Sequence, residues 1–269
     1  MEHRDVSDIV YLYGFVPSNA AAPPVNLRGV GGAPVMLLDL GETRAAVSHL
    51  SDPAFRAERL EERLADLAWV GEQGLAHERV VAWFVDHADI LPARLFSLHS
   101  SEAALRDTLA GSVSGLAERL RAFAGRREWD LKVAYDAAEL GNHGPEISPE
   151  LRALAHAIDT APPGRRYLLE RKRADLAKLE LRRSARHLAD ELLAALATHA
   201  LQTRVLPLSQ EVATSTVVLT AALLVDRTAE PALQHEAAER IDRLRALGVL
   251  VTFSGPWAPY RFMEADVIT

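Results

Sequence analysis

The stretch TSTVVLTAALLV, from Thr214 to Val225, is the strongest indicator of fold in the second half of the chain. It is rich in apolar and β-branched residues and holds no Gly, Pro or charge, so it predicts a strand buried in a sheet. Thr203 to Leu208, just before it, predicts a short strand. Pro231 to Leu247 predicts a helix ended by Gly248, and Val249 to Phe253 predicts a last strand.

Upstream of this core, a strand and a long helix complete the pattern. Trp129 to Tyr135 alternates as a strand. Residues 137–163 form a connection with a short helical stretch near 149–158. Pro162-Pro-Gly164 then opens a helix over about 165–200, far longer than the sheet needs. The order β-α-β-β-α-β predicts a modified ferredoxin-like fold with an extended first helix.

The first half predicts a second mixture of strands and helices. Its expected elements are a strand at Ile9–Val16, a hairpin of Pro34–Leu40 and Thr43–Ser48, helices at Asp66–Ala88 and Ser101–Phe123, and an extended Ile90–Phe96. The helix that starts at Ser101 is expected to stop before Gly125. We therefore predict an α+β protein of two domains, 1–125 and 126–269.

Composition narrows the class of protein. The 269 residues carry a net charge of −7, and the half before Gly125 holds 11 basic and 17 acidic side chains. This is not the basic excess of a nucleic-acid binder. The chain has no cysteine, which excludes disulfides and cysteine-ligated zinc and is consistent with a reducing cytoplasm. The acidic N-terminus does not resemble a secretory signal. No window reaches the ~18 uncharged apolar residues of a membrane span.

Motifs for catalysis are weak. His77, His87 and His99 invite a metal hypothesis, but none forms an H-E-x-x-H motif, and histidines on a helix surface or in a cap are the simpler interpretation. Gly111-Ser-Val-Ser-Gly115 lies in a helical pattern and not at a strand–helix elbow. Gly29-Val-Gly-Gly32 precedes no helix and cannot cradle a phosphate as a nucleotide loop does. We predict no catalytic, cofactor or metal site. A metal-dependent hydrolase using the three histidines stays the alternative.

The predicted long helix carries a strong basic segment. Residues 165–187 hold nine Arg or Lys and three acids. A nucleic-acid arm is one interpretation, but Tyr167 is the only aromatic there for base stacking. A solvated amphipathic helix is the simpler one, and it presents a positive face to an acidic partner protein. Arg171, Arg182 and Arg183 are the candidate contacts on this helix.

The segment Ser254-Gly-Pro-Trp-Ala-Pro-Tyr-Arg-Phe-Met263 is the most unusual in the chain. Its prolines favour an extended backbone, and its aromatic residues supply large apolar faces with polar atoms. One interpretation is a terminus that folds back and covers the core. The other is a docking surface, with Trp257 and Tyr260 as candidate protein contacts.

At this segment the chain resembles a known family. Gly255-Pro-Trp-Ala-Pro-Tyr-Arg-Phe262 is similar to the C-terminal G-P-W-P-P-Y-x-F signature of the gas vesicle GvpL/GvpF family, with Ala258 where proline is common. Further matches in the same order are Tyr11-Leu-Tyr-Gly14, Ala68-Trp69 with His77, Leu91-Pro-Ala-Arg-Leu-Phe96, Glu128-Trp-Asp-Leu-Lys-Val133 and Leu223-Leu-Val225. Together these pieces span nearly the whole chain.

The resemblance implies a non-enzymatic accessory protein of gas vesicle formation with two α+β domains. It implies a cytoplasmic, vesicle-associated protein that needs no cofactor. Its expected partners are the small hydrophobic shell subunit of the GvpA type and other accessory proteins, bound in a chaperone-like manner during nucleation or growth of the vesicle that gives buoyancy. Neither a nucleic acid nor a membrane is expected as a partner. Nucleic-acid binding through residues 165–187 stays a second alternative.

Overall fold

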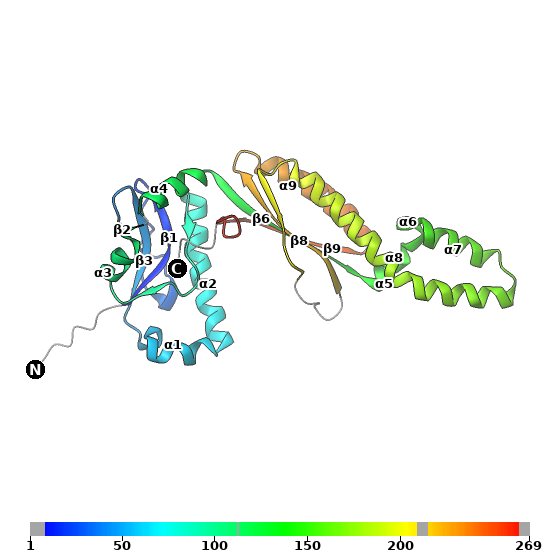
Figure 1. Cartoon of the computed structure of the whole chain (residues 1–269), viewed down its shortest axis with the longest axis horizontal. Helices are drawn as coiled ribbons and strands as arrows, with labels where there is room; N and C mark the ends of the chain where they lie inside the picture. The colour runs from blue at the N-terminus through cyan, green and yellow to red at the C-terminus, as the bar shows by residue number, and fades with distance from the viewer. Residues whose placement is uncertain (1–8, 112, 209–214, 264–269) are drawn as a thin grey trace, which may run out of the picture. The chain divides into compact units, whose positions relative to one another are not determined.

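A computed structural model of the chain describes residues 9–111, 113–208 and 215–263 (Figure 1). Contacts divide them into two compact units, residues 9–127 with 256–263 and residues 128–255. The N-terminal segment that argued against a secretory signal lies largely outside the described residues, as does Thr214. None of the described helices is both long and apolar enough to cross a bilayer.

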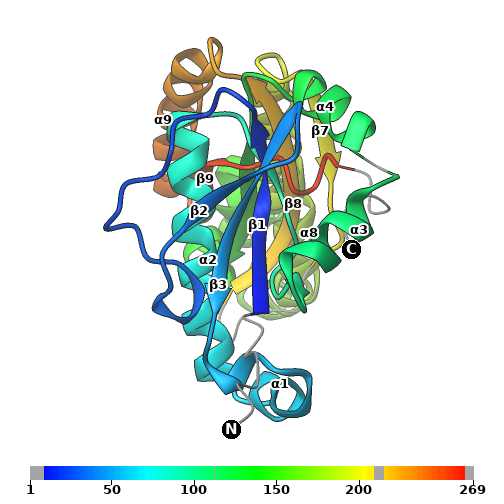
Figure 2. The same cartoon turned by 90° about the vertical axis from the view of Figure 1, so that its left-hand side faces the viewer.

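The first unit is a sheet with helices on both faces. Its elements are β1 Ile9–Pro17, η1 Val30–Gly32, β2 Met36–Asp39, β3 Thr43–Leu50, η2 Pro53–Phe55, α1 Ala57–Leu64, α2 Leu67–His87, β4 Leu91–Pro92, β5 Leu98–His99, α3 Glu102–Leu109 and α4 Val113–Ala122. The strands lie in the order β2-β3-β1-β4, and β5 also pairs with β1. Helix α2 covers one face, while α3 and α4 cover the other (Figure 2).

The central strand β1 is buried on both faces, and a bulge changes its alternation. Tyr11 and Tyr13 point toward α2, and Leu12 points toward α3 and α4. The register with β3 shifts between Leu12 and Gly14, so Phe15 lies on the α3 and α4 side. A bulge of this kind favours glycine, and at Gly14, with φ +157°, a Cβ atom would overlap the Leu91 carbonyl oxygen. β1 supplies two cores because both of its faces are covered, and the bulge moves Phe15 to the α3 and α4 side.

Two predictions for the first half are wrong in detail. The predicted single helix from Ser101 to Phe123 is two helices, because α3 ends at Leu109 and α4 begins at Val113. Gly111 lies between them, and glycine costs about 1 kcal/mol relative to alanine inside a helix. The predicted extended segment at residues 90–96 keeps only the two-residue strand β4.

The second unit has the topology that the sequence predicts. Its elements are β6 Arg126–Asp136, α5 Ala137–Asn142, α6 Gly144–Ile147, α7 Pro149–Asp159, α8 Pro163–Ala197, β7 Gln202–Val205, β8 Ser215–Asp226, α9 Glu230–Ala246 and β9 Val249–Trp257. The strand order is β7-β8-β6-β9. The first strand therefore lies between the third and the fourth, as in ferredoxin-like folds. The predicted α+β class with a modified ferredoxin-like part is confirmed.

Helix α8 is longer than the sheet that it covers. At ~1.5 Å per residue its 35 residues span about 52 Å. Its C-terminal half buries a row of side chains against the strands, namely Leu181, Ala185, Ala189, Leu192 and Leu196. Its N-terminal half extends beyond the strands and packs on α7 (Figure 1). The predicted extension of this helix is therefore a helical hairpin.

The C-terminal segment leaves the ferredoxin-like unit. Residues 256–263 group by contacts with the first unit, whereas the sequence placed all of residues 126–269 in one domain. The boundary at residue 125 stays a prediction. The segment groups with the first unit because its apolar side chains Ala258 and Phe262 are buried, and Ala258 belongs to the core under α2.

Candidate protein-binding site

The exposed half of α8 carries the three arginines predicted as contacts. Pro162 precedes the helix and Pro163 occupies its first turn, where a missing backbone N–H costs nothing. Helix formers such as Leu, Lys, Arg, Glu and Ala then dominate. Arg171, Arg182 and Arg183 are all exposed. Arg183 Nη1 donates to Glu180 Oε1 at 2.7 Å, and Glu180 itself is buried.

The hairpin with α7 fixes which side of α8 faces solvent. Leu151, Leu154 and Ile158 of α7 are buried, and α7 packs on α8. Arg166 of α8 donates through Nε to the Ile158 carbonyl oxygen at 3.3 Å, which supplies a donor to the C-terminal end of α7. The opposite side of α8 exposes Leu168 to 65% and Leu179 to 55%. Apolar and basic side chains therefore share one solvent-facing surface.

The other two candidate residues lie on the C-terminal segment of the first unit. Trp257 is 37% exposed. Tyr260 is half-buried against the core under α2, and its hydroxyl donates to Glu78 Oε1 at 2.9 Å. The five candidates thus belong to two units, three on α8 and two on this segment. Tyr260 has a structural role as the anchor of the segment on α2.

Tyr260 is one end of a hydrogen-bonded row that runs into the core. Its hydroxyl lies 3.2 Å from His77 Nε2, and His77 Nδ1 lies 2.8 Å from the Tyr11 hydroxyl. The Phe96 backbone N–H donates to that same Tyr11 oxygen at 3.2 Å. Since Tyr260 donates to Glu78, its oxygen accepts from His77 Nε2–H, and Nδ1 accepts from Tyr11. These bonds match a neutral His77 that carries its proton on Nε2.

Burial explains why His77 is neutral. His77 is 2% exposed, and burial lowers the pKa of its imidazole from 6.5 to about 4. Burial also raises the pKa of the Tyr11 phenol and the pKa of the Glu78 carboxyl, and the Tyr260 hydrogen bond partly opposes the shift at Glu78. These shifts keep His77 and Tyr11 uncharged near neutral pH. The row therefore stabilises the core and the attachment of the C-terminal segment.

The three histidines of the metal hypothesis have separate surroundings. Both ring nitrogens of His77 are bonded to tyrosines. His87 stacks on Trp83 and bonds through Nδ1 to the Trp83 carbonyl oxygen at 2.7 Å. His99 lies in β5, paired with β1. Within residues 9–111, 113–208 and 215–263, no three His, Asp or Glu side chains gather as metal ligands.

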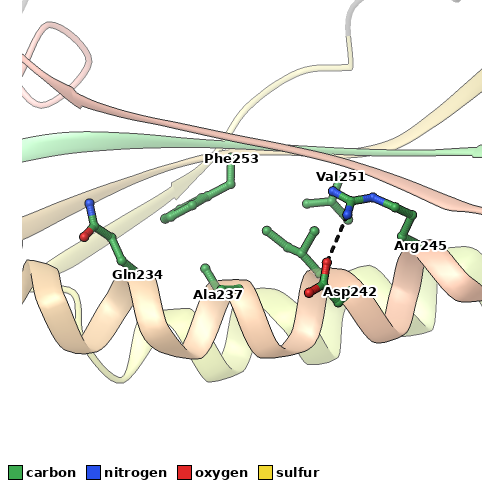
Figure 3. Close-up of a pocket in the computed structure, with 8 residues that line it drawn as sticks. Gln234, Ala237, Asp242, Arg245, Val251 and Phe253 are labelled. Carbon is green, nitrogen blue, oxygen red and sulfur yellow. Dashed lines mark hydrogen bonds and ion pairs between the residues drawn. The ribbon is translucent and has the colours of Figure 1, made fainter.

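A groove in the second unit lies between α9 and β9 (Figure 3). Its volume is about 360 Å³, at the low end for ligand pockets. Its apolar lining includes Ile241, Val251 and Phe253, and Phe253 also stacks on Trp129. At the rim, Arg245 Nη1 donates to Asp242 Oδ1 at 2.9 Å, so these charges offset each other. The groove contains none of the five candidate residues.

The exposed leucines of α8 and the buried row of Tyr11 and His77 were not predicted from the sequence. The sequence did not show that Leu168 and Leu179 stay exposed beside the arginines, although they stand eleven residues apart, which is three helical turns. Tyr11 and Tyr13 stand two residues apart in a strand, a spacing that places both on one face. Their partner His77 lies 66 residues from Tyr11 in the sequence, and no local pattern links them.

Comparison with known proteins identifies the class. A family model described as gas vesicle synthesis protein GvpL/GvpF matches residues 9–264. Gas vesicle protein L of a Streptomyces strain is 29% identical over 264 residues, covering 96% of this chain and 94% of that protein. Gas vesicle protein L1 of Halobacterium salinarum is 28% identical over 272 residues, covering 97% and 92%.

Solved structures agree with the fold. The crystal structure of GvpF from Anabaena superposes with a TM-score of 0.66 at 19% identity, covering 97% of this chain and 98% of that one. GvpF from Microcystis aeruginosa gives 0.65 at 17% identity, covering 94% and 98%. The protein is thus of the gas vesicle synthesis class. It belongs to the GvpL/GvpF family, as its sequence predicted, and has a role in gas vesicle assembly.

Proposed function

We propose that this protein binds the small hydrophobic shell subunit, of the GvpA type, together with other accessory proteins during nucleation or growth of the gas vesicle. It does so in the cytoplasm, associated with the forming vesicle, by binding and without catalysis or a cofactor. The family supports the setting. The observation that carries the proposal is the exposed face of α8, with Arg171, Arg182 and Arg183 beside exposed leucines.

Chemistry favours this surface as the contact. A subunit that lines a gas space must expose apolar surface before it assembles, and such surface aggregates in water. A helix face that offers leucines for burial and arginines for orientation holds such a chain without enclosing it. Trp257, with 37% of its surface exposed, is a second contact of the same mixed character.

Co-expression with a tagged shell subunit and measurement of the captured protein tests the proposal. Replacing Arg171, Arg182 and Arg183 by Gln is expected to weaken capture about tenfold, which corresponds to ~1.4 kcal/mol. The matched control replaces three other exposed arginines of the same unit, Arg204, Arg227 and Arg243, and removes the same charge.

Trp257→Ala and Tyr260→Phe separate the roles of the C-terminal residues. Loss of capture in Trp257→Ala with a normal melting temperature supports a direct contact. Tyr260→Phe keeps the ring and removes the bond to Glu78, so it is expected to loosen the segment without removing an apolar contact. Failure of the wild-type protein to capture the subunit would overturn the proposal, as would equal capture by the α8 triple variant and its control.

A further inference from the structure

One face of α8 repeats after eleven residues. Leu168 is followed three and four residues later by Arg171 and Lys172, and Leu179 is followed at the same spacing by Arg182 and Arg183. Eleven residues turn an α-helix by three turns and about 20°, with a rise of ~16.5 Å. The two Leu-x-x-basic-basic sets therefore lie in line, one above the other. We call these six residues the leucine–arginine face.

All six residues of the leucine–arginine face are exposed to solvent in the described part of the chain. Leu168 and Leu179 are 65% and 55% exposed, and the four basic side chains are also exposed. The core of the second unit takes a different side of the helix, through Leu181 and Ala185. Arg183 also pairs with Glu180, which holds it beside Leu179. Each leucine thus has two basic side chains one turn further along the helix.

Charge and shape together define the partner. Residues 168–183 contain six basic and three acidic residues, in a chain whose net charge is −7. Two exposed leucines three turns apart match two apolar positions at the same spacing on a second helix, since both helices follow the same periodicity. The basic side chains that follow each leucine match acidic ones on that second helix.

We propose that the leucine–arginine face of α8 docks an acidic amphipathic helix of a partner protein. The partner helix places apolar residues on Leu168 and Leu179 and carboxylates against Arg171, Lys172, Arg182 and Arg183. This deepens the proposed function and rests on it where the partner is a gas vesicle protein. The chemistry of recognition does not depend on which protein supplies the helix.

Other polyanions fit the face less well. A nucleic acid offers no apolar groups for the two leucines, and Tyr167 is the single exposed aromatic nearby for stacking. A membrane-surface helix needs a broad apolar face, and this face offers two leucines about 16.5 Å apart with cations between them. An acidic helix uses both parts of the face at once.

The test uses a defined probe and the full chain. The probe is a 22-residue peptide that carries Leu and Glu in the same eleven-residue repeat, and its control is a scrambled peptide of the same composition. Fluorescence anisotropy is measured with wild-type protein and with Leu168→Ser/Leu179→Ser, Arg171→Gln/Arg182→Gln and the control Arg204→Gln/Arg227→Gln. Duplex DNA and phosphatidylglycerol vesicles are tested in parallel.

The expected result is at least about tenfold tighter binding of the repeat peptide than of the scrambled one, with a tenfold loss in both face variants and none in the control. Equal binding of the two peptides overturns the proposal, and so does preferential binding of DNA or vesicles. The leucine variants change exposed positions and are checked for an unchanged melting temperature. If wild-type protein captures the shell subunit but not the repeat peptide, this inference fails and the proposed function stands. If it binds the repeat peptide but not the shell subunit, the proposed function fails and this inference stands.

Discussion

Replacement of Tyr11 by Phe tests the buried row of hydrogen bonds most directly. Tyr11 is fully buried, and its hydroxyl donates to His77 Nδ1 at 2.8 Å and accepts from the Phe96 N–H at 3.2 Å. Phenylalanine keeps the ring and its contacts. The variant loses only the oxygen, so the change in stability reports the two hydrogen bonds.

The magnitude follows from what is left unpaired. Each net hydrogen bond is worth about 1 kcal/mol, and a buried polar group left without a partner costs about 1–3 kcal/mol. The Nδ1 atom of His77 loses its donor in a residue that is 2% exposed, where water does not readily replace it. We therefore expect the free energy of unfolding of the first unit to fall by about 3 kcal/mol.

Urea denaturation followed by near-ultraviolet circular dichroism measures this change. With a slope of about 2 kcal/mol per molar urea, the midpoint should fall by about 1–2 M. The control is Tyr135→Phe in the second unit, since Tyr135 is also buried but its hydroxyl bonds to no described residue. A loss in Tyr11→Phe no larger than in this control, within about 0.5 kcal/mol, would refute the reasoning.

Three further predictions concern the same unit. Because burial lowers the pKa of His77 to about 4, the unfolded chain binds its proton first as the pH falls below about 6.5. The free energy of unfolding should therefore drop by about 3 kcal/mol between pH 6.5 and pH 4. Glu78, whose pKa is raised in the folded state, contributes in the opposite direction. The drop should be absent when His77→Gln is measured over the same pH range. In Gly29→Ala, the new Cβ atom would overlap the Tyr13 hydroxyl and disturb its bond to Ser48, so thermal unfolding should show a loss of about 2–3 kcal/mol; an unchanged melting temperature would contradict this contact. Asp66 accepts from the N–H groups of Ala68 and Trp69 at the start of α2, and its replacement by Ala should cost about 1 kcal/mol in the same measurement, whereas no loss would show that the cap is dispensable.

The fold of the second unit was largely predictable because its signals are local. The apolar run of β8, the proline start of α8 and the glycine after α9 each specify an element without knowledge of distant residues. The strand order then follows from the β-α-β-β-α-β pattern. The break between α3 and α4 was missed, because the apolar residues continue across Gly111 at helical spacing.

The candidate site was predictable only in part. The basic character of α8 is visible in the sequence, and Arg171, Arg182 and Arg183 are exposed as a solvated face requires. Periodicity alone did not tell which leucines of the helix stay exposed. That depends on where the sheet ends and where α7 packs, since the same residue type is buried at Leu181 and exposed at Leu179.

The family, the α+β class, the ferredoxin-like order of elements and the long basic helix can all be recognised in the amino-acid sequence. These features follow from local composition, spacing and motif. The bonds of Tyr260 to Glu78 and His77, and the row that links it to Tyr11, are visible only in the folded first unit. His77 and Tyr260 are 183 positions apart in the sequence, and only the folded chain brings them together. Polar groups enclosed in a core must pair with one another, and no local pattern in the sequence identifies such distant partners.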